Sequence, residues 1–210
     1  MPTLDIDFVS DFVCPWCWLG LKQLQAAKLP ASITFRPYIL DPLVPREGRD
    51  YKDYMRAKFA NEEGSDTERF KPMREHLEAE GPAHGITFRF GEMTRRPNTL
   101  DAHRLMRWAD GQDLALECAS ALFRAYFEEL RDIGDRAVLA DIAHEIGLDR
   151  DLVAELLASD ADEAKVNEQI SFFRRLGVSG VPTFIYNGQT AVQGAQGPAT
   201  HRKVAQSLRG

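Results

Sequence analysis

The chain has few cysteines, only three among 210 residues. A small protein held together by disulfides needs more, so this class of scaffold is excluded. A structural zinc site needs four Cys or His ligands at short spacing. Only Cys14 and Cys17 are closely spaced, and the five histidines form no pair with ligand spacing. We therefore predict that the protein has no metal site.

Long apolar runs, a secretory signal and a basic surplus are also absent from the sequence. No run approaches the roughly 20 apolar residues of a membrane-spanning helix. Residues 1–5 enter a strand-like pattern without the basic and apolar regions of a secretory signal. The net charge of -6 argues against nucleic acid or an anionic membrane as the main partner. From these absences we expect a cytoplasmic protein.

The most informative feature that is present is a pair of cysteines separated by two residues, Cys14 and Cys17. Before the pair, apolar and polar residues alternate over residues 4–9, which is typical of a strand. After it, Leu21 and Leu24 share a helical face with Cys17. The pair is therefore predicted at a strand-to-helix junction, a context typical of a redox-active dithiol.

This position gives the two cysteines different predicted roles. The first turn of a helix has unpaired N–H groups and the positive end of the helix dipole, which favour a thiolate on Cys14. Pro15 suits the first helical position, because no partner is available there for the N–H that proline lacks. Cys17 lies one turn inside and would resolve a mixed disulfide on Cys14. Two inert core thiols are the alternative, and the proline and the junction argue against it.

The rest of the chain divides into strand, helical and strand regions. Residues 33–38 form a second predicted strand, and residues 183–186 and 190–192 form a hairpin around Asn187-Gly188. A last helix is predicted over residues 198–208. Between the strands the sequence is mostly helical, with helices predicted at residues 51–60, 67–80, 97–111, 114–130, 135–146, 149–158 and 162–176.

Several other residues have a structural interpretation from their helical position. Cys118 lies on the broad apolar face of the helix at 114–130, so we expect a packed core thiol. The arginines Arg95, Arg96, Arg104 and Arg107 are expected to form a solvated basic face, with contact to substrate carboxylates as the alternative.

Three sequence motifs occur in an order that resembles a known family. They are SDFVCPWCWLG at residues 10–20, PNTLDAHRL at 97–105 and GVPTF at 180–184. Together they resemble the DsbA-like family of the thioredoxin superfamily, and more closely its FrnE-like branch. The resemblance covers essentially the whole chain. It implies an α/β thioredoxin-like fold, with residues 1–41 and 177–210 in the thioredoxin-like domain and residues 42–176 in a large, all-helical inserted domain.

The resemblance also implies a function and a site. A dithiol-disulfide oxidoreductase of this kind uses Cys14 and Cys17 as its catalytic residues. The peptide bond before Pro182 is expected to be cis and to lie beside the cysteines, so that Val181 presents its backbone to an extended substrate or to glutathione. Pro15 and Trp16 are expected to contact the substrate, with Trp16 as an apolar landing surface.

The sequence leaves alternatives open for the role of Asn98 and for the activity of the protein. Asn98 is expected either to hydrogen-bond a substrate or to cap a helix. Relatives of the same branch include 2-hydroxychromene-2-carboxylate isomerases and kappa-class glutathione transferases, in which the position of Cys14 is typically Ser. A glutathione-dependent isomerase or transferase is therefore the first alternative function, and a binding or chaperone-like module whose redox pair is incidental is the second. We expect no bound cofactor, with glutathione open as a co-substrate, protein or small-molecule thiols and disulfides as partners, and either a monomer or a homodimer.

Overall fold

A four-stranded mixed sheet forms the centre of the computed structural model, which describes residues 4–59 and 66–208. The order of the strands is β2-β1-β5-β6. Strand β1 pairs in parallel with β2 and antiparallel with β5, and β5 pairs antiparallel with β6. The strands are β1 Leu4–Ser10, β2 Ala31–Pro37, β5 Thr183–Tyr186 and β6 Thr190–Gln193.

The predicted hairpin is confirmed between β5 and β6. Asn187 and Gly188 both have positive φ, 49° and 66°, which is the backbone of a two-residue turn matched to the twist of the strands. In β1, Phe8 stacks on Phe184 with ring centroids 4.8 Å apart, whereas Val9 points to the opposite face and packs with Phe173. The sheet is therefore covered on both faces at the end of β1 that leads to the cysteines.

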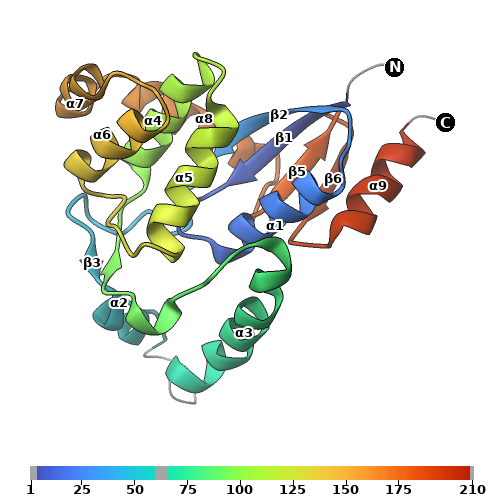
Figure 1. Cartoon of the computed structure of the whole chain (residues 1–210), viewed down its shortest axis with the longest axis horizontal. Coiled ribbons are helices and arrows are strands. Elements are labelled where there is room, and N and C mark those ends of the chain that lie inside the picture. Colours follow the sequence, from blue (N-terminus) through green and yellow to red (C-terminus); the bar gives the residue numbers. More distant parts are fainter. Residues whose placement is uncertain (1–3, 60–65, 209–210) are drawn as a thin grey trace.

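Helices connect and cover these strands, as Figure 1 shows. The sheet and α9 occupy the right of that view, and the inserted helices lie to the left and below. None of the helices in the described part of the chain is long and apolar enough to cross a membrane. The helices are α1 Pro15–Ala26, α2 Tyr51–Phe59, α3 Asp66–Glu80, α4 Leu100–Asp110, α5 Ala115–Phe127, α6 Arg136–Glu145, α7 Arg150–Ala158, α8 Glu163–Arg175 and α9 Pro198–Ser207.

The inserted region contains one small sheet that the sequence did not predict. Strands β3, Arg49–Asp50, and β4, Arg95–Arg96, pair antiparallel over two residues each. Two-residue strands of charged residues have no alternating pattern, so nothing in the sequence indicated them. The pairing brings the stretch before α2 against the stretch before α4.

One continuous core joins the sheet to the inserted helices. Phe8 of β1, Cys17 of α1, Phe123 of α5 and Leu139 of α6 are all buried in the same cluster. The expected α/β thioredoxin fold with a large helical insertion is confirmed, but the expectation that the insertion is all-helical is wrong, because it contains β3 and β4. The division into residues 1–41 and 177–210 against 42–176 stays a prediction, and buried contacts run across it.

The expected solvated basic face is wrong for Arg104. Its side chain is fully buried and donates to the carbonyl oxygens of Ala161 (2.7 Å), Leu156 (2.7 Å) and Ser159 (2.9 Å). It also pairs with Asp101 at 2.7 Å. A guanidinium has five N–H donors, and here it satisfies the backbone of the α7–α8 connection from inside the core.

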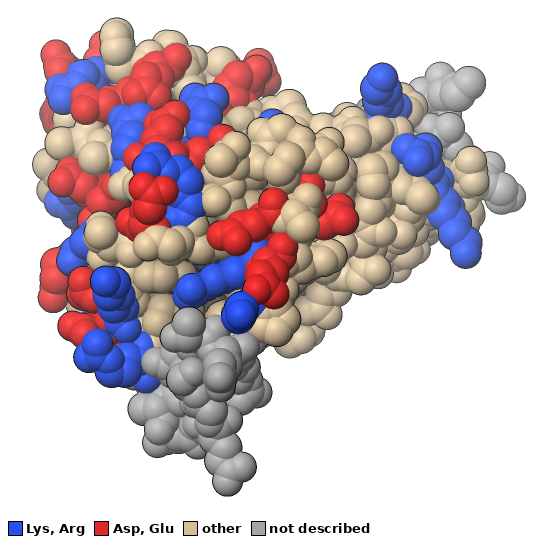
Figure 2. All heavy atoms as spheres, turned by 60° about the horizontal axis from the view of Figure 1, so that its bottom comes forward, with Lys and Arg blue, Asp and Glu red and all other residues tan. Residues whose placement is uncertain are grey.

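The surface charge is mixed rather than of one sign. On the face drawn in Figure 2, Lys and Arg lie among Asp and Glu over the part formed by the inserted helices, and a largely uncharged stretch lies beside them.

Candidate functional site

The cysteine pair lies where β1 ends and α1 begins, as predicted. Cys14 is the N-cap of α1, with extended φ and ψ of -96° and 110°, and Pro15 occupies the first turn. The N–H of Cys14 donates to the carbonyl of Asp11 at 3.0 Å, and the N–H of Cys17 donates to the carbonyl of Cys14 at 3.0 Å. The short loop and the first helical turn thus hold the two cysteines on the same end of the helix.

Burial distinguishes the two thiols. Cys14 is 4% exposed, and Cys17 is 0% exposed. Burial, together with a hydrogen bond to Cys14 and the charge of Cys14, raises the pKa of Cys17 well above its ordinary value, while a backbone hydrogen bond from Asp11 opposes this. Cys17 is therefore a protonated thiol near neutral pH, as suits a residue that waits for a second step.

The Val181–Pro182 peptide bond is cis and lies beside the cysteines. The thiol of Cys14 donates to the carbonyl oxygen of Val181 at 3.6 Å. Gly20 of α1 allows this close approach, because a Cβ there would lie 3.2 Å from both Pro182 and Phe184. The backbone of Val181 is therefore next to the reacting sulfur, where an extended substrate can pair with it.

A pocket of about 240 Å³ opens beside Cys14, between α1 and the α2–α3 pair. Its wall is mostly apolar and contains three methionines, which adapt to apolar groups of different shapes. Trp16 is half-buried here, with its ring centroid 5.5 Å from that of His76. The lining residues are Val13, Cys14, Pro15, Trp16, Leu40, Tyr51, Tyr54, Met55, Lys58, Phe70, Met73, Phe90, Met93, Arg96, Tyr126, Phe127 and Val181.

A polar cluster around Asp41 adjoins this pocket. The hydroxyl of Tyr54 and the ammonium of Lys58 donate to Asp41 at 2.7 and 2.8 Å, and Arg96 forms a close ion pair with it. Although burial opposes the shift, the charges of Arg96 and Lys58 hold the pKa of Asp41 below its usual value. Arg96 also donates to the carbonyl of Val13 at 3.2 Å. The cluster therefore fixes the residue that precedes Cys14.

Asp41, Tyr54 and Lys58 were not predicted for the site, and for Arg96 contact with substrate carboxylates was only the alternative interpretation. Arg96 is 7% exposed, so its expected place on a solvated face is wrong. Tyr54 and Lys58 are four apart on a predicted helix, but nothing in that spacing connects them to Cys14. Only the fold brings together Asp41 from the stretch after β2, the two residues of α2, and Arg96 of β4.

The predicted site residues are brought together with one exception. Cys14, Pro15, Trp16 and Val181 line the pocket, and Cys17 and Pro182 lie behind them, Cys17 in contact with Cys14 and Pro182 close to Gly20 of α1. The described lining residues do not include Asn98, whose amide instead donates to the carbonyl of Val44 at 2.8 Å and accepts from the N–H of Leu100 at 3.0 Å. The N-cap of α4 is Thr99, so Asn98 is not the cap itself but the residue before it, held against the start of α4 by the bond to Leu100. The substrate contact of Asn98 stays a prediction.

The third cysteine, Cys118, lies on α5. Cys118 is fully buried, and burial raises its pKa, so it is a core thiol as predicted. Within residues 4–59 and 66–208, no group of three or more His, Cys, Asp or Glu side chains is arranged to hold a metal ion.

Comparison with known proteins agrees with this geometry. The model of the DSBA-like thioredoxin domain matches residues 5–206. The uncharacterized protein YwbO of Bacillus subtilis (strain 168) is 24% identical over 204 residues, which cover 96% of this chain and 95% of YwbO.

Several solved structures share the fold. A probable DsbA oxidoreductase from Streptomyces coelicolor has a TM-score of 0.86 and 25% identity, covering 96% of this chain and 88% of that one. A 2-hydroxychromene-2-carboxylate isomerase has a TM-score of 0.75 and 18% identity, covering 97% and 95%. The cytosolic disulfide reductase DsbM from Pseudomonas aeruginosa, solved with GSH, has a TM-score of 0.68 and 19% identity, covering 98% and 99%. The chain belongs to the family of DsbA-like thioredoxin domains, and the mixture of oxidoreductases and an isomerase among its structural neighbours matches the FrnE-like branch.

Proposed function

We propose that this protein is a dithiol-disulfide oxidoreductase in which Cys14 attacks and Cys17 resolves. The observation that carries the proposal is the position of the Cys14 thiol, which lies at the start of α1, lines the pocket and is 3.6 Å from the carbonyl of Val181. The pocket gives a substrate disulfide access to this sulfur.

The proposed reaction balances in two steps. The Cys14 thiolate attacks one sulfur of a substrate disulfide, so that a mixed disulfide forms and one substrate thiolate leaves. Cys17 then loses its proton and attacks the sulfur of Cys14. The Cys14–Cys17 disulfide forms, the second substrate thiolate leaves, and two electrons have passed from the protein to the substrate.

The lining of the pocket supports a substrate with an apolar group beside its disulfide. Trp16, Pro15 and the three methionines supply the apolar surface, and the backbone of Val181 supplies hydrogen bonds to an extended chain. Glutathione is proposed as the thiol that reduces the Cys14–Cys17 disulfide, since the disulfide reductase DsbM, solved with GSH, has the same fold. A cytoplasmic location is part of this proposal.

The alternative is a glutathione-dependent isomerase or transferase. Its support is the fold shared with 2-hydroxychromene-2-carboxylate isomerase and the presence of Lys58 and Arg96 in a pocket of about 240 Å³, which suits a small aromatic carboxylate. Such a reaction needs one group that activates the thiol of glutathione. A glutathione-dependent isomerase or transferase reaction would give no role to Cys17. The presence of Cys17 therefore favours disulfide exchange.

Insulin reduction, measured beside glutathione conjugation of an aromatic electrophile, tests the proposal. We expect insulin reduction by the wild type, its loss in Cys14→Ser, a trapped mixed disulfide in Cys17→Ser, and full activity in the matched control Cys118→Ser. Insulin reduction that survives Cys14→Ser would overturn the proposal. Conjugation that survives Cys17→Ser, without any insulin reduction by the wild type, would establish the alternative instead.

A further inference from the structure

A second hollow adjoins the pocket of about 240 Å³ that contains Cys14, which we call the cysteine pocket. The second hollow has a volume of about 320 Å³, within the range of small-molecule sites, roughly 300–1,000 Å³. We call it the basic hollow, after the three cations that line it, Lys52, Arg56 and Arg74. They come from α2 and α3, which lie at the bottom of the view in Figure 1.

Four residues line both hollows and so join them. They are Tyr51 and Met55 of α2, and Phe90 and Met93 of the stretch between α3 and α4. On α3, the neighbours Met73 and Arg74 divide between the two, because Met73 lines the cysteine pocket and Arg74 lines the basic hollow. A ligand with its sulfur at Cys14 can therefore extend over a mostly apolar surface into the basic hollow.

The charges of the basic hollow are not balanced by the protein. None of the described residues that line it is Asp or Glu. Arg74 is half-buried and Lys52 is exposed, and neither forms an ion pair or a side-chain hydrogen bond with the part of the chain that the structure describes. Arg56 is paired with Asp53 at 3.2 Å. Two cations thus stand together without a counter-ion in a chain of net charge -6, and an anionic ligand would supply one.

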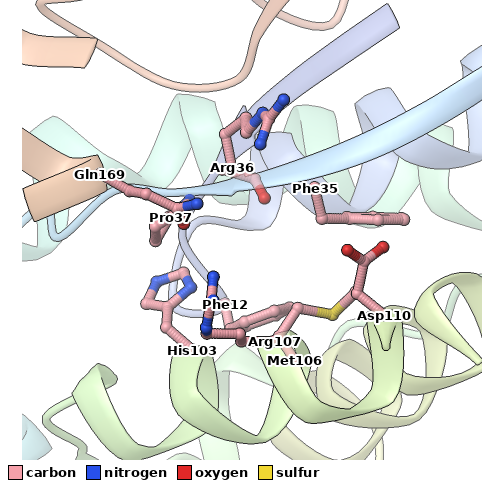
Figure 3. A pocket seen from close by; sticks show the side chains of 10 residues that line it. Phe12, Phe35, Arg36, Pro37, His103, Met106, Arg107, Asp110 and Gln169 are labelled. Atoms are coloured by element: carbon pink, nitrogen blue, oxygen red, sulfur yellow. The ribbon is translucent and has the colours of Figure 1, made fainter. Parts of the chain in front are cut away.

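Two other hollows lack this combination of features. The cavity drawn in Figure 3 lies between α4 and β2 and measures about 40 Å³, which is room for roughly two water molecules. Its cations, Arg36 and Arg107, are paired with Asp7 and Asp162. A hollow of about 670 Å³ beside α7 also has its cations, Arg107 and Lys165, paired with Asp162. Neither of the two shares a lining residue with the cysteine pocket.

We propose that the basic hollow binds the phosphate or carboxylate groups of a low-molecular-weight disulfide whose sulfur atoms lie at Cys14. The inference rests on the proposed function and names a substrate class for it. Arg74 offers a planar guanidinium, which binds phosphate and carboxylate through paired N–H donors, and Lys52 adds a point charge. The apolar residues that line both hollows contact the spacer between the sulfur and the anionic group.

The reaction is the two-step exchange of the proposed function, with the small disulfide as oxidant. Cys14 bonds to one substrate sulfur and the first anionic thiolate leaves. Cys17 then bonds to Cys14 and the second thiolate leaves. The protein gains one S–S bond, the S–S bond of the substrate is broken, and two electrons pass to the substrate. The two cysteine protons go to solvent, from which the released thiolates take up protons.

Single-turnover oxidation of the reduced protein by four disulfides tests the inference. The probes are oxidised coenzyme A, which bears phosphates, glutathione disulfide, which bears carboxylates, the uncharged bis(2-hydroxyethyl) disulfide and the cationic cystamine. Acid quenching, alkylation and mass spectrometry give the rate at which the Cys14 and Cys17 thiols are lost. Each rate is divided by that of the same disulfide with dithiothreitol, which removes differences in intrinsic reactivity.

In the wild type we expect the normalised rate for an anionic disulfide to exceed that for the uncharged one by about tenfold, and cystamine to be the slowest. In Arg74→Met the ratio of the anionic to the uncharged rate should fall about tenfold, as expected for the loss of one charge-assisted hydrogen bond. Arg74→Lys keeps the charge and should retain part of the ratio. A preference for coenzyme A identifies phosphate as the bound group, and a preference for glutathione disulfide identifies carboxylate.

Lys71→Met is the matched control, because it removes one positive charge from the same helix. Lys71 is exposed, pairs with Glu75 at 3.8 Å and does not line the basic hollow. Its ratio of anionic to uncharged rates should equal that of the wild type. Raising the salt from about 0.05 to about 0.5 M should lower the ratio in the wild type, because screening weakens the attraction between the cations and the ligand.

The outcomes separate this inference from the function on which it rests. If none of the four disulfides oxidises Cys14 and Cys17 of the wild type, the proposed function fails. If the uncharged disulfide reacts and the anionic ones react no faster, the proposed function stands and the inference is overturned. A ratio in Arg74→Met equal to that of the wild type would also overturn it. The rate with the uncharged disulfide shows whether each variant is still folded around Cys14.

Discussion

Arg96 donates to the carbonyl oxygen of Val13, the residue directly before Cys14, although the two are 83 residues apart in the sequence. The same guanidinium pairs with Asp41 and is 7% exposed. The inserted region therefore does more than cover the sheet, because it also positions the backbone at the start of α1.

Removing Arg96 alone should destabilise the protein more than removing Arg96 and Asp41 together. In Arg96→Met the carboxylate of Asp41 loses its buried cation, and we expect a loss of about 3 kcal/mol in the free energy of unfolding. Adding Asp41→Leu should recover most of it, since the buried carboxylate is then gone and the partly exposed Lys58 is left to solvent. Urea unfolding of the two single variants and the double variant measures the coupling. Additive losses would show that the two residues act independently.

The order of alkylation should follow the order of burial and position. We expect iodoacetamide to label Cys14 first, because Cys14 lines the open pocket whereas Cys17 and Cys118 are fully buried. The pKa values of Cys17 and Cys118 are raised by burial, so both should react only after unfolding. Mass spectrometry of digested samples gives the order, and early labelling of Cys17 or Cys118 would reverse the assigned roles.

Trp16 offers a test of what sets the reduction potential. The dipeptide between the cysteines, Pro15-Trp16, carries no charge. In Trp16→His an imidazolium beside the helix end would stabilise the thiolate of Cys14, so we expect a higher potential, by about 30 mV for each tenfold change in the equilibrium constant. Trp16→Phe is the uncharged control. The reduction potentials are measured against glutathione. Equal potentials in the wild type and Trp16→His would show that residue 16 does not set the potential of the Cys14–Cys17 couple.

Sequence patterns predicted the features that depend on neighbours along the chain. The strand-to-helix junction at Cys14, the Asn187-Gly188 turn and the helix starts at Asp135 and Asp149 all have local causes. These causes are proline at the first turn, positive φ, and carboxylates that cap the helices by accepting backbone N–H bonds. These features recur in the structure close to the predicted positions.

Features that depend on contacts between distant segments were missed. Arg104 looked like part of a solvated basic face, because its helical position gives no sign of the three carbonyl groups that it satisfies from the α7–α8 connection. The cluster of Asp41, Tyr54, Lys58 and Arg96 likewise assembles from three separate segments. A polar residue that is buried by its partners cannot be distinguished from a solvated one by periodicity alone.

Asn98 should prove to be a structural residue. In Asn98→Ala the N–H of Leu100 and the carbonyl of Val44 both lose a partner, so we expect a loss of about 1 to 2 kcal/mol in unfolding free energy with an unchanged KM for insulin reduction. Asn98→Asp is the matched variant, because it keeps the acceptor for Leu100 and should lose less. A raised KM in a stable Asn98→Ala protein would restore the substrate-binding role.

His201 of α9 should make the fold sensitive to acid. Its ring is fully buried, Nδ1 is hydrogen-bonded to the hydroxyl of Tyr186, and Nε2 has no partner among the described residues. Burial lowers the pKa of His201 from 6.5 to about 4, so the unfolded chain binds a proton first as the pH falls. The contribution of neutral His201 to the free energy of unfolding is therefore fully present above about pH 6.5. It is lost progressively as the pH falls to about 4, by about 3 kcal/mol in total.

The variant His201→Gln isolates this effect, because its amide still accepts from Tyr186 but does not titrate. Urea unfolding at a series of pH values should give a flatter profile for His201→Gln than for the wild type over that window. The contribution of Asp41 to the free energy of unfolding is lost at a lower pH than that of His201, because the pKa of the Asp41 carboxyl is held below its ordinary value of 3.8. The exposed His144 supplies the control His144→Gln, which should follow the wild type. Parallel profiles for His201→Gln and the wild type would show that α9 tolerates a charged His201, and the acid sensitivity would then belong to other groups.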